Sequence, residues 1–129
     1  MVIATICIGS LGILVFGLGL AVSLTRQSTK TSIGHSHDPA DRLHKVVRAH
    51  ANTCEFAPML AVLFLVIGWR GPGALVQLLM VLATAARYSI VAGLILTPTL
   101  DKPHPLRFAG ALGTYICGLL LCLVALLGA

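Results

Sequence analysis

Four long and predominantly apolar stretches, separated by shorter polar ones, make up this chain. They cover roughly residues 2–24, 43–69, 74–96 and 106–127. A run of about 18 or more apolar residues can cross the ~30 Å hydrocarbon layer of a bilayer as a helix. A membrane β-barrel would alternate apolar and polar residues in segments of about ten, which this chain does not do. The pattern predicts one all-α domain over residues 1–129, an integral membrane four-helix bundle.

The ends of the stretches carry recognisable signals. Residues 2–24 include no charged residue. Without a basic n-region, and being longer than the usual h-region, this run is typical of a membrane span and not of a signal peptide. The second helix is expected to begin near Asp41 or Leu43, with Asp38 or Asp41 as its N-cap. Residues 70–73, with the sequence RGPG, predict a tight turn.

Composition supports the membrane interpretation. The chain has 129 residues, of which 57% are hydrophobic and 10% charged, and its mean hydropathy is +0.97. A soluble domain has about a quarter charged residues. The four cysteines are scattered through apolar stretches, where a thiol behaves as a small hydrophobe. His35, His37 and Asp38 could bind a metal, but in a polar loop they are expected to be solvated, so we predict no metal site.

Basic residues gather on one side of the predicted bundle. The first and third loops and their flanks hold seven of them, against Arg70 alone on the other side: Arg26, Lys30, Arg42, Lys45, Arg48, Lys102 and Arg107. The positive-inside rule therefore places these loops in the cytoplasm and both termini outside it. This rule and anionic headgroups explain the net charge of +5, so nucleic-acid binding is not expected.

Ionisable residues within the apolar stretches point to a polar pocket. Arg48, Asn52 and Glu55 follow i, i+4, i+7 spacing and share one helix face. A charge at the bilayer centre costs at least ~2.5–3.5 kcal/mol and needs a partner. For Glu55 the expected partner is Arg87, at similar depth in the third helix. One interpretation is that such a pair does no more than fix helix packing. The other is that it organises a pocket that also includes Arg107 and suits an anionic small molecule.

The second helix carries a recognisable motif. Residues 48–58 read RAHANTCEFAP and fit the pattern Arg-Ala-x-x-Asn-x-x-Glu-x-x-Pro. Arg87, Gly93 and the LRFAG sequence at residues 106–110 fit as well. In these features the chain resembles the MAPEG superfamily, the membrane-associated proteins in eicosanoid and glutathione metabolism, over nearly its whole length.

The resemblance implies a homotrimer of four-helix subunits that binds glutathione as a co-substrate between neighbouring subunits. It implies that glutathione is held by Arg26, Arg48, Asn52, Glu55 and Arg87. Arg107 matches the arginine that stabilises the glutathione thiolate, and is the predicted catalytic residue. That role is physically sound, because a cation beside a thiol favours its nucleophilic thiolate form.

The chain departs from its eukaryotic relatives at three positions. Ile90 and Leu94 stand where several relatives have tyrosines that contact glutathione, and Phe56 replaces another tyrosine. Eicosanoid synthesis is therefore not expected, and glutathione use is left open. The short chain is more similar to bacterial members, which would place it in a bacterial inner membrane as a multi-pass protein.

Two classes of function follow. The first is a membrane-bound glutathione transferase, or peroxidase-like enzyme, that acts on lipophilic electrophiles. The alternative is a non-catalytic, degenerate MAPEG-like protein or a small four-helix transporter. Small multidrug exporters carry an essential glutamate in their first helix, whereas residues 2–24 have no charge here. This observation disfavours the transporter.

Overall fold

Four long helices form the fold. The computed structural model describes residues 1–128, and within them the helices are α1 (Val2–Thr29), α2 (Arg42–Trp69), α3 (Ala74–Ile95) and α4 (Pro105–Leu127), with no strand. Each helix is long and apolar enough to cross a membrane. The prediction of an all-α membrane four-helix bundle is confirmed.

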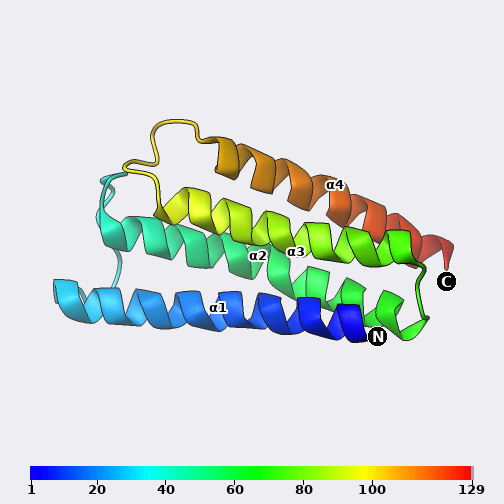
Figure 1. Ribbon diagram of the computed structural model, residues 1–129. Helices are drawn as coiled ribbons and strands as arrows, with labels where there is room; N and C mark the ends of the chain where they lie inside the picture. The colour runs from blue at the N-terminus through cyan, green and yellow to red at the C-terminus, as the bar shows by residue number, and fades with distance from the viewer. Residues whose placement is uncertain (129) are drawn as a thin grey trace.

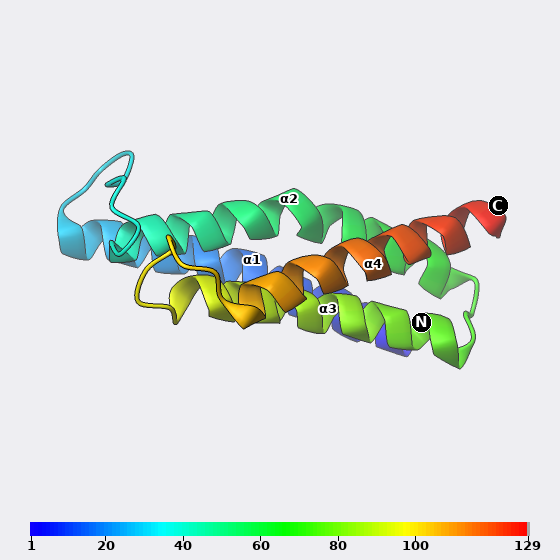
Figure 2. The ribbon, with the colours of Figure 1, turned by 90° about the horizontal axis from the view of Figure 1, so that it is seen from above.

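The helices run side by side with alternating direction (Figure 1). Within the described residues, α2 and α3 contact each other and α1, whereas α1 has no contact with α4. The α1–α2 and α3–α4 loops lie at the same end of the bundle, and the N- and C-termini lie at the other end (Figures 1 and 2). The end that holds both long loops, called the loop end below, is the one with most of the basic residues.

The first helix is longer than expected. Its predicted end lay near Leu24, but α1 continues to Thr29. Hydroxyl groups in its last turns bond back to helix carbonyls: the Thr25 hydroxyl donates to Ala21 O (2.7 Å), and the Thr29 hydroxyl donates to Thr25 O (2.9 Å). These bonds satisfy the hydroxyl groups within the helix, so the polar residues are compatible with its last turns. The helix stops at Lys30, which adopts the left-handed conformation with φ 52°.

The other helix ends follow local sequence signals. Asp41 caps α2, where its carboxylate accepts from the His44 N–H at 2.8 Å. At α4 the cap is His104, whose Nδ1 accepts from the Leu106 N–H at 3.3 Å. Gly71 has φ 68° in the turn between α2 and α3, a conformation that favours glycine. Caps and turns thus fix where each span begins and ends.

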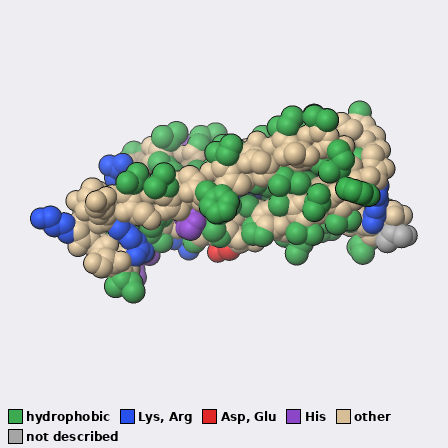
Figure 3. Space-filling view, turned by 90° about the horizontal axis from the view of Figure 1, so that it is seen from below, with side chains coloured by type: hydrophobic (Ala, Val, Ile, Leu, Met, Phe, Trp, Pro, Cys, Tyr) green, Lys and Arg blue, Asp and Glu red, His purple; other side chains and the backbone are tan. Residues whose placement is uncertain are grey.

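The outer surface of the subunit is apolar. Exposed side chains of this kind include Phe16 (81%), Phe108 (71%) and Leu119 (68%). Figure 3 shows hydrophobic side chains spread over one face, with basic side chains at its two ends. Apolar side chains facing outward along four spanning helices fit a lipid environment. Buried side chains such as Phe64, Met80 and Leu121 fill the interior.

Gly110 sets the close approach of α3 and α4. A Cβ there would lie 2.6 Å from the Ile90 nitrogen and 2.7 Å from the Ala86 oxygen, both backbone atoms. We expect Gly110→Ala to lower the free energy of unfolding by about 1–3 kcal/mol, because the helices must move apart. The control is Gly12→Ala, where a Cβ meets nothing within 4 Å. Equal stability of the two variants in detergent unfolding would contradict this packing role.

Candidate functional site

A basic pocket of about 350 Å³ opens between α2, α3 and α4 at the loop end. Helix α2 contributes Arg48 and Asn52, and α3 contributes Ile90 and Leu94. Helix α4 contributes Arg107, Phe108 and Ala111, and the loop between α3 and α4 contributes Pro103 and His104. Three of the six predicted site residues, Arg48, Asn52 and Arg107, are brought together here. No carboxylate lines the pocket.

Arg107 is held at the mouth of the pocket by the α3–α4 loop. Its Nη1 donates to Leu100 O (2.9 Å) and to Lys102 O (3.1 Å). The absence of a side chain at Gly93 makes this position possible, since a Cβ there would lie 2.7 Å from the Arg107 Cγ. Both bonds use Nη1, so Nε and Nη2 remain available to a ligand.

Arg87 lies behind the pocket and holds Asn52. Its side chain is only 1% exposed, and its Nη2 donates to both the Asn52 backbone oxygen (2.9 Å) and Oδ1 (2.6 Å). Its Nη1 reaches the Thr114 hydroxyl at 3.5 Å, and its Cζ lies 4.9 Å from the centre of the Phe56 ring. With Oδ1 fixed by Arg87, the amide N–H₂ of Asn52 is left free to donate. Arg87 therefore positions a pocket residue and does not line the pocket.

The expected buried pair between Glu55 and Arg87 is wrong for the isolated subunit. Glu55 is exposed, whereas Arg87 is buried against Asn52 and Phe56. Arg87 reaches the neighbouring Asn52 instead of Glu55. At 100° per residue, Glu55 points about 60° away from Asn52 and 100° away from Phe56 around the helix axis.

Arg26 also lies outside the pocket of its own subunit. It lines a separate pocket of about 320 Å³ with Gln27, Lys30, Thr31 and Ser32. Its Nη1 donates to Ser32 O at 3.1 Å, and its Nε is buried without a partner among the described residues. Within one subunit, neither Arg26 nor Glu55 lines the pocket of Arg48 and Arg107.

Some pocket residues were not predicted. His104 and Phe108 line the pocket beside Arg107, and neither belongs to the helix-two motif. The His-Pro pair that opens α4 could have identified His104 as a helix cap, since proline is favoured at the first helical position. Ile90 and Leu94, the aliphatic positions in the third helix, also line the pocket and make its α3 wall apolar.

The arrangement suits an anionic ligand with an apolar attachment. Arg48 is exposed, Arg107 is half-buried, and Asn52 offers hydrogen bonds between them. Guanidinium groups bind carboxylates in a planar, bidentate manner. Within residues 1–128 no group of three or more His, Cys, Asp or Glu side chains comes together. The chemistry of the pocket is therefore that of cations, one amide and an apolar wall.

The sequence profile of the MAPEG family matches residues 4–127, nearly the whole chain. The protein belongs to the MAPEG family, which confirms the resemblance seen in the helix-two motif. No curated protein and no solved structure matches the chain. Family membership supports a membrane protein whose function is related to glutathione or eicosanoid metabolism.

Proposed function

We propose that the protein is a membrane-bound glutathione transferase, or peroxidase-like enzyme, that acts on lipophilic electrophiles. The observation that carries this proposal is the convergence of Arg48, Asn52 and Arg107 on one pocket. Glutathione has two carboxylates, an amine, two amides and a thiol. A pocket with two guanidinium groups, an amide and no carboxylate is matched to its charge.

In the proposed reaction, the thiol of glutathione loses its proton to solvent, and Arg107 stabilises the resulting thiolate. The thiolate sulfur forms a bond to the electrophilic carbon, whose leaving group departs with the bonding electron pair. In the peroxidase-like variant, two glutathione molecules reduce a hydroperoxide to an alcohol and water and form glutathione disulfide. Ile90, Leu94 and Phe108 supply the apolar wall for a substrate that arrives from the membrane.

A homotrimer would complete the site. Glu55 is exposed on the subunit, halfway along a spanning helix. A carboxylate is costly in lipid, so this position favours contact with a neighbouring subunit or with a water-filled cavity. Glu55 and Arg26 would then meet glutathione at a subunit boundary. A detergent-corrected mass in solution measures the assembly directly.

The proposed location is a bacterial inner membrane, with the loop end in the cytoplasm. Seven basic residues lie in or beside the two long loops, and these loops share one end of the bundle (Figure 1). By the positive-inside rule, both termini then lie outside the cytoplasm. The pocket with Arg107 would face cytoplasmic glutathione.

The function is tested by mixing purified protein with glutathione and a generic aromatic halide. We expect enzyme-dependent conjugation, and a thiolate signal in the ultraviolet difference spectrum of bound glutathione. S-methylglutathione, which has no thiol, is the control and should give neither signal. Absence of thiolate and of turnover would contradict the proposal.

One observation favours the second candidate, a non-catalytic member of the family. The α3 wall of the pocket is made by Ile90 and Leu94, which cannot donate hydrogen bonds to glutathione. A pocket of this kind could bind the tripeptide weakly without activating its thiol. Glutathione binding in calorimetry, combined with no thiolate signal at any pH, would select this candidate.

A further inference from the structure

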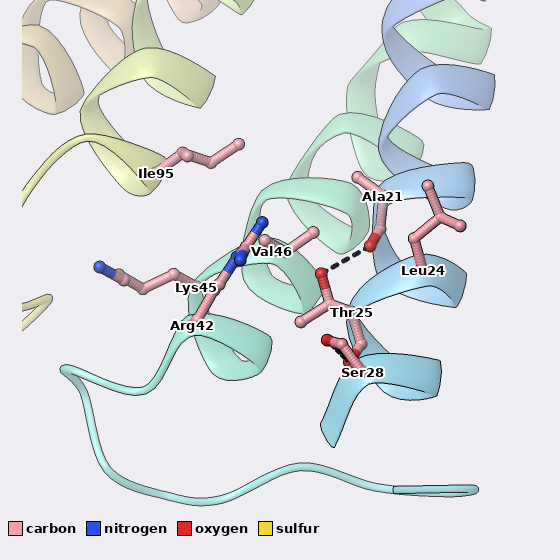
Figure 4. Close-up of a pocket in the computed structure, with 8 residues that line it drawn as sticks. All are labelled: Ala21, Leu24, Thr25, Ser28, Arg42, Lys45, Val46 and Ile95. Carbon is pink, nitrogen blue, oxygen red and sulfur yellow. Dashed lines mark hydrogen bonds between the residues drawn. The ribbon is translucent and has the colours of Figure 1, made fainter. Parts of the chain in front are cut away.

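A second basic pocket lies at the loop end, on the other side of α2. It has a volume of about 610 Å³ and is formed by α1, α2 and α3, without α4. Figure 4 shows its eight lining residues: Ala21, Leu24, Thr25, Ser28, Arg42, Lys45, Val46 and Ile95. It shares no residue with the pocket of Arg48 and Arg107. The two are therefore separate sites.

The positive charge of this pocket is not neutralised by carboxylates. Arg42 is exposed, and Lys45 uses its Nζ for one bond, to Thr97 O at 3.1 Å, out of its three N–H groups. The carboxylates of the nearby loop serve backbone groups instead. Asp41 accepts from the His44 N–H, and Asp38 accepts from the Ala40 N–H at 2.9 Å. None of the lining residues is acidic, so the charge of the pocket favours an anion.

The hydrogen-bond donors of the pocket are its two cations. The Thr25 hydroxyl donates to Ala21 O, the bond drawn in Figure 4, and the Ser28 hydroxyl donates to Thr25 O at 2.8 Å. Both hydroxyl hydrogens are thus committed to the helix. Arg42 and Lys45 remain as a pair of charged donors one helical turn apart. Two neighbouring cations of this kind fit a phosphate group.

The remaining lining side chains form an apolar wall. Val46 and Ile95 line it from α2 and α3, and Ala21 and Leu24 from α1. Leu24 is 56% exposed, which continues the wall onto the lipid-facing surface of the subunit. One side of the pocket is thus basic and the other apolar, as in a site for an amphiphile.

The depth of the pocket fits the headgroup layer. Helix α1 has 28 residues, and at 1.5 Å per residue it is about 42 Å long, against a hydrocarbon layer of ~30 Å. Its last turns, with Thr25 and Ser28, therefore extend beyond the hydrocarbon. Arg42 and Lys45, in the first turn of α2, line the same pocket, and in Figure 4 the Lys45 side chain extends away from α1.

We propose that this pocket binds one anionic phospholipid per subunit. The phosphate of the headgroup contacts Arg42 and Lys45, and an acyl chain lies along Leu24, Val46 and Ile95. A soluble phosphate would contact the two cations but would make no apolar contact with the wall. A zwitterionic lipid would make the apolar contacts with the wall, but its headgroup cation would be repelled by Arg42 and Lys45.

The test is lipid retention by the purified full-length protein, followed by native mass spectrometry in detergent. The probes are dioleoylphosphatidylglycerol, dioleoylphosphatidylcholine and soluble glycerol 3-phosphate. We expect the wild-type protein to retain one phosphatidylglycerol per subunit. The Arg42→Gln/Lys45→Gln variant should bind it at least about tenfold more weakly, as expected when two cations near a phosphate are lost.

The matched control is Lys30→Gln/Lys102→Gln, which removes the same charge at the same end without touching this pocket. It should stay within about twofold of wild type, since surface cations act weakly and without a fixed partner. Equal loss in the control would overturn the site in favour of general surface attraction. Equal binding of phosphatidylcholine would overturn the role of the cations. Equal competition by glycerol 3-phosphate would overturn the lipid as occupant.

Discussion

Arg107→Ala should slow glutathione conjugation at neutral pH by about 100-fold, the usual effect of removing one donor from a developing or full anion. Loss of this cation raises the pKa of the bound glutathione thiol, so less thiolate is present. The rate should recover as the pH rises, and the midpoint of the thiolate titration should move upward with it. Ultraviolet difference spectra of bound glutathione and steady-state rates measure both effects across pH.

The structure calls for two companion variants. Arg107 also holds the α3–α4 loop through Leu100 O and Lys102 O, so Arg107→Ala releases that loop. Arg107→Lys keeps a cation and should retain part of the thiolate shift. Lys102→Ala removes a cation of the same loop that does not line the pocket, and should leave turnover unchanged. A thiolate titration in Arg107→Ala identical to that of wild type would make Arg107 an anchor and not a catalytic residue.

Arg87→Ala should lower the free energy of unfolding by about 3–5 kcal/mol, the second large effect. The substitution leaves a cavity where a side chain was 1% exposed, and it leaves the Asn52 Oδ1 without its donor. Asn52→Ala should cost less, about 1.5–3 kcal/mol, because the backbone oxygen still accepts from the guanidinium. Unfolding in mixed detergent micelles measures these differences.

A double-mutant cycle isolates the contact. If the contact of Arg87 with Asn52 accounts for the losses, the double variant should be more stable than the sum of the single effects predicts, because the second substitution removes no further contact. Thr84→Ala is the control on the same helix, since its hydroxyl bonds only to Met80 O. Additive losses, or a cost for Arg87→Ala no larger than that for Thr84→Ala, would contradict the proposed support of Asn52.

Most of the fold followed from hydropathy, because a lipid environment requires long apolar helices that satisfy their own backbone. The start of α2 at Arg42 and its cap at Asp41 were also within reach of local signals. The end of α1 could not be predicted from local signals. Thr25 and Thr29 are polar residues typical of loops, but here they lie in the helix and their hydroxyls bond to its carbonyls. The hydropathy of the sequence contains no information about such hydrogen bonds.

For the site, spacing along a helix was a better guide than depth in the membrane. Arg48 and Asn52 are four residues apart, so a shared face was certain once the helix formed, and both line the pocket. The partner of Arg87 depended on how α2 and α3 rotate against each other. That rotation is set by packing, for example at Gly110, whose missing Cβ admits the backbone of α3. No pattern within a single helix contains this information.

The contact between Asn52 and Arg87 has a consequence for how the chain enters the membrane. The two residues are 35 positions apart, and the acceptor precedes the donor. During synthesis, α2 and the short turn at residues 70–73 therefore emerge before Arg87 does. The guanidinium, the only charge within α3, finds an acceptor already in place on the adjoining segment. We therefore expect the order of residues along the chain to give this cation a partner as α3 enters the hydrocarbon.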